Sequence, residues 1–310
     1  MKNRVISSLI AMILLVSLIA GMVGCGTSYS MATAKVRFRI ATTTSLYDTG
    51  LWAYLEPAFE KKENVELDIV YAGTGAALNQ GKSGNVDAVV VHDPDQEKPF
   101  VDEGWGLNKR SFAYNFFMIA GPSSDPAGIK GLDPADAFKK IAEGGMKDTD
   151  KIKFVSRGDN SGTHGAEKRL WAAAGYDYAT GIQKSGRWYI EAGQGMGPTL
   201  TMANEQNAYV LCDGSTFTSY QGKLALVALV KKAAAENLNV YNVYAINPDK
   251  IKTAKIAIAK DFINWLISPD VQKLIGQYGV KEFGGPLFYP IADPTFPAIP
   301  NLTDNMQPVQ

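Results

Sequence analysis

Four turns rich in glycine and small hydroxyl residues recur in this chain, and each follows an apolar strand-like run and opens a helix-like segment. They are Thr42–Ser45, Gly73–Ala76, Arg157–Thr163 and Gly193–Gly197. The first turn of a helix leaves backbone N–H groups without partners, and the aligned peptide dipoles make that end partially positive. Each turn is therefore a candidate anion contact. Ordinary helix caps use the same residues, so one turn proves little, but four turns beside Arg157 predict one shared anionic ligand.

The N-terminus has the pattern of a secretory signal. Two basic residues among the first four precede an apolar run from Val5 to Val23, as in signal peptides that are removed from the mature protein. The run ends in Met22-Val23-Gly24-Cys25, which resembles a bacterial lipobox with methionine in place of the usual leucine; a plain cleaved signal with a chance cysteine is the alternative. We predict a lipoprotein signal peptide over residues 1–25, lipidation of Cys25 and a flexible tether over 26–35. The folded part would then lie outside the cytoplasmic membrane and be anchored to it by lipid.

The composition argues against several classes of protein. The 31 basic and 31 acidic residues balance and form no basic run, so the chain lacks the footprint of a nucleic-acid-binding protein. No stretch after the signal is long and apolar enough to cross a bilayer. If Cys25 is lipidated, Cys212 is left without a disulfide partner, and its apolar neighbours predict a buried packing role. We expect the mature protein to be a monomer.

Strand-like runs alternate with helical patterns through most of the chain, for example at Val36–Ala41, Leu67–Ala72 and Ala88–His92. This alternation predicts βαβ units with a mainly parallel sheet, and hence an α/β fold. The length that remains after the signal is enough for two lobes, each with its own core.

Three helices have clear patterns. One runs from about Leu51 into the charged segment Glu60–Glu63, and Pro57 is expected to kink or shorten it. Ser161 is placed to cap a second helix. A third is expected from about Ala254 to Ile267, where a Ser-Pro pair stops it.

Two aromatic, β-prone segments are predicted to cross between the lobes: Phe112–Ile119 and Tyr241–Pro248. If both cross, the second lobe is inserted into the first, and a ligand would lie in the cleft between them, clamped by hinge closure. The C-terminal segment is proline-rich and has no core pattern, so it is expected to be loose or to wrap the surface. The predicted division is 36–115 and 243–292 for the first lobe, 116–242 for the second lobe and 293–310 for the tail.

A series of short motifs lies in order from Ala41 to about Pro290. The series comprises Thr42–Leu51, Gly73–Gly75, Val91–Pro94, Gly121-Pro122 with Asp125–Ile129, Ser156–Asp159 with Ser161–His164, and Trp188-Tyr189 with Gly193–Gly197. As a set, these motifs resemble the tungstate-binding (and related molybdate-binding) proteins that serve ABC importers, and they cover nearly all of the mature chain. Each motif taken alone is weak.

The resemblance implies a type II periplasmic-binding-protein fold, with two α/β lobes joined by crossing strands around a ligand cleft. It implies a solute-binding protein, not an enzyme, that captures tungstate or molybdate for the permease of an ABC importer, with no cofactor besides the ligand. It also implies ligand contacts at Thr43, Thr44, Ser45 and Arg157. The helix-opening turns add five candidates: Thr74, Gly75, Ser161, Gly162 and Thr163.

Two positions depart from the family pattern. Members commonly have an acidic residue where this chain has Phe116, and an arginine in the stretch that here reads Asp213-Gly214-Ser215-Thr216. Both positions lie near a predicted crossing or cleft wall, so they bear on which anion is bound more than on whether an anion is bound.

Acidic residues beside the turns decide which anion fits. Tungstate and molybdate are fully deprotonated near neutral pH, so a selective pocket should present only hydrogen-bond donors, whereas hydrogen phosphate also needs an acceptor. Asp48, Asp93 and Asp159 could each be that acceptor. The alternative is that Asp159 caps its own turn or orients Arg157, and that Asp48 lies in the first turn of a helix. Sulfate or phosphate is therefore the second candidate ligand.

Other classes of site are less well supported. Arg157 could instead form a purely structural ion pair with Asp159. The sequence has no Gly-x-Ser-x-Gly elbow, zinc motif or Walker motif, which argues against a hydrolase. His92 and His164 could form a metal pair with Asp93, but their spacing is not that of a zinc site, and we predict no metal. The aromatic residues Trp188, Tyr189 and Tyr209 are expected to pack within a lobe.

Overall fold

The computed structural model describes residues 34–292 and 306–310. The predicted signal peptide, Cys25, most of the tether and most of the proline-rich tail lie outside the described residues, so their assignments stay predictions. Within the described ranges, none of the helices has the length and apolar character needed to cross a membrane.

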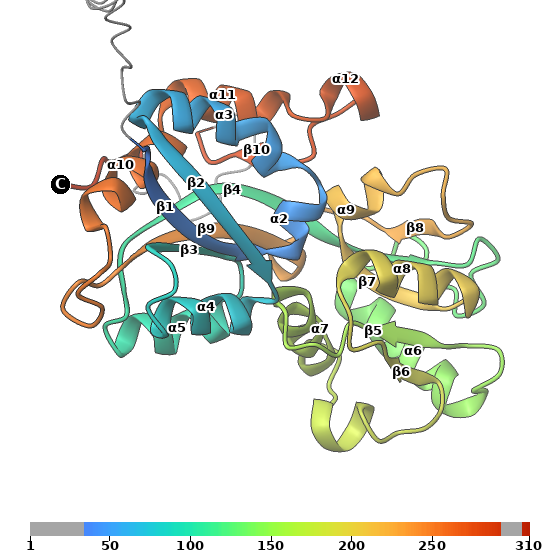
Figure 1. The fold of residues 1–310 in the computed structure, drawn as a ribbon. Helices are drawn as coiled ribbons and strands as arrows, with labels where there is room; N and C mark the ends of the chain where they lie inside the picture. Colours follow the sequence, from blue (N-terminus) through green and yellow to red (C-terminus); the bar gives the residue numbers. More distant parts are fainter. Residues whose placement is uncertain (1–33, 293–305) are drawn as a thin grey trace, which may run out of the picture. The chain divides into compact units, whose positions relative to one another are not determined.

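A continuous ten-stranded sheet runs through the molecule in the order β2-β1-β3-β9-β4-β7-β5-β6, with β8 and β10 paired to β4 (Figure 1). The strands are β1 Val36–Thr43, β2 Val65–Ala72, β3 Ala88–Val91, β4 Gly106–Gly121, β5 Phe154–Ser156, β6 Tyr189–Glu191, β7 Tyr209–Asp213, β8 Val227–Val230, β9 Leu238–Ile246 and β10 Tyr289–Pro290. The three runs predicted as strands are all strands, and β1 pairs in parallel with both β2 and β3. β5 likewise pairs in parallel with β6 and β7.

The long strand β4 joins two parts of this sheet. Its residues up to Phe116 pair with β9, whereas from Phe117 onward it pairs with β7. We call the part from β2 to β9 the first sheet and the part from β7 to β6 the second sheet. β4 therefore crosses between the two sheets within the segment predicted for this role.

The second crossing lies earlier in the chain than we predicted. β9 pairs with β3 and β4 along its length, beginning at Leu238 opposite Phe116. The chain thus returns from the second sheet between Val230 and Leu238, not within Tyr241–Pro248. The aromatic and β-branched residues of β9 reflect burial inside the first sheet, a pattern that a crossing strand shares.

Helices cover both faces of the two sheets. They are α2 Thr44–Asp48, α3 Leu51–Glu63, α4 Thr74–Lys82, α5 Pro94–Asp102, α6 Pro134–Lys147, α7 Gly162–Ala173, α8 Met196–Glu205, α9 Gly214–Ser219, α10 Ile256–Leu266, α11 Pro269–Gln277 and α12 Val280–Phe283, with a π-helical turn at Tyr178–Ile182 and a 3₁₀ turn at Ala235–Asn237. In the first sheet, α3, α10 and α11 cover one face, and α4 and α5 cover the other (Figure 1).

The helix α3 continues past Pro57 to Glu63, so the prediction that proline shortens it was wrong. Proline removes the hydrogen bond to the carbonyl of Ala53, but both residues are exposed, and water can replace that bond. The buried side chains of Leu55 and Phe59 hold the helix against the core on either side of the proline. The predicted third helix, α10, ends at Leu266, and the Ser-Pro pair that follows it starts the next helix, α11.

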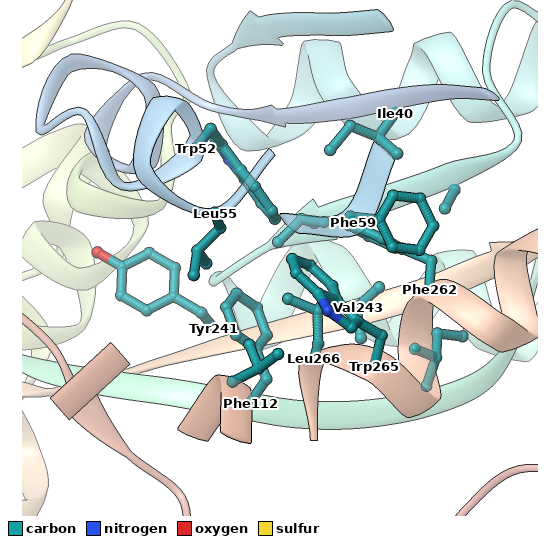
Figure 2. Close-up of a cluster of buried hydrophobic side chains, with 14 of the residues drawn as sticks. Ile40, Trp52, Leu55, Phe59, Phe112, Tyr241, Val243, Phe262, Trp265 and Leu266 are labelled. Carbon is teal, nitrogen blue, oxygen red and sulfur yellow. The ribbon is translucent and has the colours of Figure 1, made fainter. Parts of the chain in front are cut away.

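Aromatic side chains dominate the core of the first sheet, as Figure 2 shows. The ring of Phe262 lies 4.9 Å from that of Phe59 and 5.9 Å from that of Trp52. The indole Nε1 of Trp52 donates to Thr42 Oγ1 at 2.9 Å. Because Thr42 opens the first glycine- and hydroxyl-rich turn, the core holds that turn in place.

The last residues of the chain return to this core. Val309 is buried, and its backbone N–H and carbonyl pair with the side-chain amide of Asn264 at 2.7 and 3.0 Å. The end of the predicted tail therefore packs on α10.

Candidate anion-binding site

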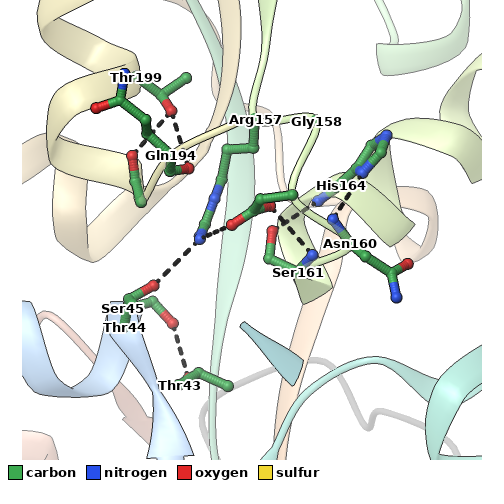
Figure 3. Close-up of polar contacts among 12 residues, drawn as sticks. Thr43, Thr44, Ser45, Arg157, Gly158, Asn160, Ser161, His164, Gln194 and Thr199 are labelled. Carbon is green, nitrogen blue, oxygen red and sulfur yellow. Dashed lines mark hydrogen bonds and ion pairs between the residues drawn. The ribbon is translucent and has the colours of Figure 1, made fainter. Parts of the chain in front are cut away.

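The fold brings the four predicted turns together. Arg157 in the third turn donates from Nη2 to Thr44 Oγ1 in the first turn at 3.3 Å (Figure 3). The N–H of Gly193 in the fourth turn donates to the carbonyl of Arg157 at 2.8 Å. A Cβ atom placed on Gly73 in the second turn would lie 3.4 Å from the Cα of Ser161. Turns far apart in sequence thus form one site, with contributions from both sheets.

Each turn opens a helix: α2, α4, α7 and α8. Ser161 caps α7, as predicted, by accepting from the N–H of His164 at 3.2 Å. At the starts of α2, α4 and α8, by contrast, no side chain of the capping residue bonds the helix. The first N–H groups of these helices therefore lack the usual side-chain cap and can donate to an anion.

Arg157 is buried at the centre of the site, with 2% of its surface exposed. Its Nη2 contacts both Thr44 and the carboxylate of Asp159 (Figure 3). Asp159 also accepts from the N–H of Ser161 at 3.1 Å. Asp159 therefore orients Arg157 and closes its own turn, as one of the two predicted alternatives had it.

Three buried donors of the four turns lack a partner within the described ranges: Arg157 Nε, Thr74 Oγ1 and Thr163 Oγ1. A buried polar group without a hydrogen bond costs about 1–3 kcal/mol. All three come from the second and third turns, where α4 and α7 begin. A ligand with several acceptor oxygens would satisfy them.

A further set of polar side chains lies on the side of the site formed by the first sheet. Thr43 Oγ1 is 3.1 Å from Ser45 Oγ, and Ser45 Oγ is 3.3 Å from His92 Nε2. Burial lowers the pKa of His92 to about 4, so its ring is neutral at pH 7. A Cβ atom on Gly162 would lie 2.5 Å from the ring of His92. His92 therefore supports the first and third turns together, a role that its sequence neighbours did not reveal.

The carboxylate of Asp93 is engaged outside the turns, whereas that of Asp159 is bonded to Arg157 and Ser161. Asp93 caps α5, and it accepts from Arg169 Nη1 at 2.8 Å and Gln96 Nε2 at 2.6 Å. Asp48 is the last residue of α2 and does not lie in the first turn of a helix, which corrects one of our expectations. Partial burial raises the pKa of Asp48, while Arg157 lowers it, so its carboxyl lies within electrostatic range of the guanidinium.

The two histidines belong to separate networks. His164 accepts from the N–H of Asn160 at Nδ1 (3.1 Å) and contacts the hydroxyl of Tyr178 at Nε2 (2.8 Å), whereas His92 contacts Ser45. Among the described residues, no cluster of three or more His, Cys, Asp and Glu side chains could hold a metal ion.

Glu167 supports the third turn through a hydrogen bond from Ser156. This fully buried carboxyl accepts from Ser156 Oγ at 2.7 Å, and Ser156 Oγ accepts from the N–H of Gly158 at 3.1 Å. Burial raises the pKa of Glu167 to about 7, against hydrogen bonds from Ser156, Tyr189 and Trp171 that lower it. Sequence reasoning missed Glu167 because it lies inside a helix, eleven residues from its partner.

An amide pair joins the two sides of the site near Gly75. Gln96 Nε2 donates to the carbonyl of Asn160 at 3.1 Å, and Asn160 Nδ2 donates to Gln96 Oε1 at 3.3 Å. A Cβ atom on Gly75 would lie 2.7 Å from Gln96 Oε1 and 3.0 Å from Asn160 Nδ2. Glycine at this position therefore makes room for the pair.

The two departures from the family pattern lie side by side. A Cβ atom on Gly214 would lie 3.2 Å from the carbonyl oxygen of Phe116. Both residues line a cavity of about 170 Å³, together with Lys231 and Tyr289 among others. None of the nine candidate ligand residues lines this cavity. Other packing predictions are confirmed, since Cys212, Trp188, Tyr189 and Tyr209 are all buried.

Residues 29–270 match the model of the PBP superfamily domain. The fold and the site thus define a ligand-binding protein of the periplasmic-binding-protein superfamily, type II. A tungstate-binding protein (TupA) from Peptoclostridium acidaminophilum is 42% identical over 263 residues, covering 84% of this chain and 87% of that protein. The chain belongs to this tungstate-binding family of ABC-transporter substrate-binding proteins, whose members are not enzymes.

Two solved structures are similar along nearly their whole length. The tungstate ABC transporter structure from Geobacter sulfurreducens has a TM-score of 0.69 and 43% identity, covering 78% of this chain and 98% of that one. The tungstate-binding protein from Desulfovibrio alaskensis has a TM-score of 0.68 and 39% identity, covering 82% and 98%.

Proposed function

We propose that this chain captures tungstate, or the chemically similar molybdate, outside the cytoplasmic membrane and delivers it to an ABC importer. The observation that carries the proposal is the buried guanidinium of Arg157, which bonds across to Thr44 while its own Nε lacks a partner among the described residues. The relatives reported above are named for tungstate binding, which supports this choice of ligand.

The proposed ligand matches the hydrogen-bonding character of the site. A tetrahedral dianion offers four acceptor oxygens and no donor, and the turns offer uncapped helix N–H groups, threonine hydroxyls and one guanidinium. The acceptors that hydrogen phosphate would require at Asp93 and Asp159 are already engaged with Arg169, Gln96, Arg157 and Ser161. This arrangement favours a deprotonated oxyanion over a protonated one.

The ligand contacts remain those predicted from the turns. The proposed set is Thr43, Thr44, Ser45, Thr74, Gly75, Arg157, Ser161, Gly162 and Thr163. Gly75 and Gly162 would contribute backbone N–H groups. They have no side chains, and Gln96 and His92 occupy that space.

The remaining parts of the proposal concern the whole protein in its cell. The mature chain would begin at a lipidated Cys25, remain monomeric and meet the permease of the importer with no cofactor other than its oxyanion. A lobe boundary near residue 115 belongs to this proposal too. Metabolic labelling with a fatty acid, compared between the wild-type protein and Cys25→Ser, tests the anchor.

Calorimetry of the signal-less protein with tungstate, molybdate, sulfate and phosphate tests the function. We expect tungstate and molybdate to bind at least about tenfold more tightly than phosphate, which corresponds to about 1.4 kcal/mol. Tighter binding of phosphate or sulfate would favour the second candidate ligand. Absence of binding to any of the four ions would refute the proposal.

A further inference from the structure

A buried row of polar side chains runs from the second sheet to the ligand site. The row begins at Asp213, whose carboxylate accepts from Ser215 Oγ at 2.5 Å, and continues with Asn115 Nδ2 donating to Ser215 Oγ at 2.9 Å. Asn239 Nδ2 then donates to Asn115 Oδ1 at 2.8 Å. All these side chains are at most 2% exposed. We call this row the Asp213 relay.

The acid at its end fixes the direction of every hydrogen bond in the relay. A carboxylate only accepts, so Ser215 must donate to Asp213 and therefore accepts from the nitrogen of Asn115. The oxygen of Asn115 then faces Asn239 and receives its nitrogen. The remaining oxygen of Asn239 is left as an acceptor.

That acceptor belongs to the surroundings of His92. Asn239 Oδ1 and His92 Nδ1 are both buried, and neither has a bonded partner within residues 34–292 and 306–310. Burial lowers the pKa of His92, and a hydrogen-bonding contribution from the Asn239 side chain opposes this shift. A proton on Nδ1 would satisfy both atoms, and Nε2 would then accept from the hydroxyl of Ser45, 3.3 Å away.

This arrangement conflicts with the needs of a bound dianion. A fully deprotonated oxyanion can only accept, so Ser45 must turn its hydroxyl proton toward the ion. Nε2 of His92 would then lose the hydrogen bond it accepts, unless it gains a proton and donates to Ser45 instead. A neighbouring dianion favours the charged imidazolium.

We propose that His92 takes up a proton from solvent at Nε2 when the oxyanion binds, because the Asp213 relay leaves the oxygen of Asn239 as an acceptor for the other ring proton, on Nδ1. The proposal rests on the proposed function, since it requires an anionic ligand beside Ser45. In the bound state, Nδ1–H donates to Asn239, Nε2–H donates to Ser45 Oγ and Ser45 O–H donates to the ion. One proton leaves solvent for each ion bound in this form.

Three charged groups, together with burial, set the protonation of His92. Asp213 and Asp93 favour the imidazolium, whereas Arg157 and burial oppose it. Tyr241 packs against the ring at 4.9 Å and stays a neutral phenol, because burial raises its pKa. Binding an anion near Arg157 offsets the repulsion from this guanidinium, so the ligand tips the balance toward the charged ring.

Proton uptake is measured by calorimetry at pH 6.0 in two buffers whose ionisation enthalpies differ. For the full mature protein binding tungstate, we expect an uptake of about 0.3–1 proton per ion that decreases as pH rises. His92→Gln should bind tungstate with an uptake below about 0.1 proton per ion. The matched control is His164→Gln, which removes the other histidine and should keep the wild-type uptake.

Nitrogen-15 NMR of the histidine rings supplies a readout that a purely structural role would not change. The chain has only two histidines, so His164→Gln assigns both signals in an untagged protein. We expect a neutral Nδ1–H ring for His92 without ligand, an imidazolium with tungstate at pH 6.0, and loss of the Nδ1–H preference in Asn239→Leu. A neutral His92 in the bound protein, or an Nε2–H ring before binding, would overturn the inference. Failure of wild type to bind tungstate would instead refute the proposed function.

Discussion

Arg157 Nη2 lies 3.3 Å from Thr44 Oγ1, although 113 residues separate them in the sequence. Thr44 begins the helix after β1 in the first sheet, and Arg157 follows β5 in the second sheet. This contact joins the two sheets at the one place where the four turns meet. It explains how small, locally ordinary turns become a single candidate anion site.

Replacing Arg157 by alanine should weaken tungstate binding by about 3 kcal/mol, roughly a hundredfold, because it removes a buried charge-assisted contact. The fold should persist, with circular dichroism unchanged, since Asp159 keeps its bond to the N–H of Ser161. Calorimetry measures the loss. Arg169→Ala is the matched control, because that arginine pairs with Asp93 and Asp95 and should matter much less to affinity. Wild-type affinity in Arg157→Ala would mean that the arginine is structural.

The unpartnered hydroxyls of Thr74 and Thr163 should separate binding from stability. Valine at either position should leave the unliganded protein as stable as wild type or up to about 1 kcal/mol more stable, because a buried donor without a partner is removed. Tungstate affinity should fall by about tenfold in each variant. Thermal unfolding with and without tungstate measures both effects. The control is Thr199→Val, which removes a hydroxyl bonded to the carbonyl of Gly195, so that stability should fall instead. Equal tungstate affinities for all three variants would count against direct contact of Thr74 and Thr163 with the ion.

Adding a methyl group at Gly75 should disturb the amide pair between Gln96 and Asn160, because the new Cβ would lie 2.7 Å from Gln96 Oε1. We expect Gly75→Ala to weaken tungstate binding severalfold. The double variant Gly75→Ala/Gln96→Ala removes the clash and should recover part of the lost affinity. If the second substitution brings no recovery, the methyl group acts on the ligand directly.

Glu167 should make stability depend on pH near neutrality. Its pKa rises from 4.5 to about 7 in the folded protein, so the folded state binds more protons than the unfolded state between these values. Stability should therefore fall as pH rises from 4.5 to 7, by up to about 3 kcal/mol from this group. Glu167→Gln should lose this fall, as measured by urea unfolding at pH 5 and 7.5. Parallel pH profiles for the two proteins would show that Glu167 is ionised throughout.

Features set by neighbours in sequence could be predicted. The strands β1 to β3, the cap at Ser161 and the helix-opening turns depend on local patterns of apolar, glycine and hydroxyl residues. The effect of Pro57 could not be predicted from sequence, because it depends on the core, which holds Leu55 and Phe59 on either side of the proline. The prediction of the second crossing failed for a related reason, since strands buried in one sheet and strands that cross between sheets have the same composition.

Within the site, the turns were predictable but their supports were not. Asp159 lies two residues from Arg157, and its orienting role followed from that spacing. His92 and Glu167 act through Ser45 and Ser156, partners that only the folded chain brings near. Sequence thus identifies the donors of this site better than the groups that position them.

A crystal structure with tungstate, located by anomalous scattering from tungsten, tests the central claim most directly. We predict one strong tungsten peak. The oxygens of that ion should lie within hydrogen-bonding distance, about 3 Å, of the Arg157 guanidinium and the Thr74 and Thr163 hydroxyls, with no carboxylate among the contacts. A tungsten peak elsewhere, or a carboxylate of Asp48, Asp93 or Asp159 against the ion, would contradict it.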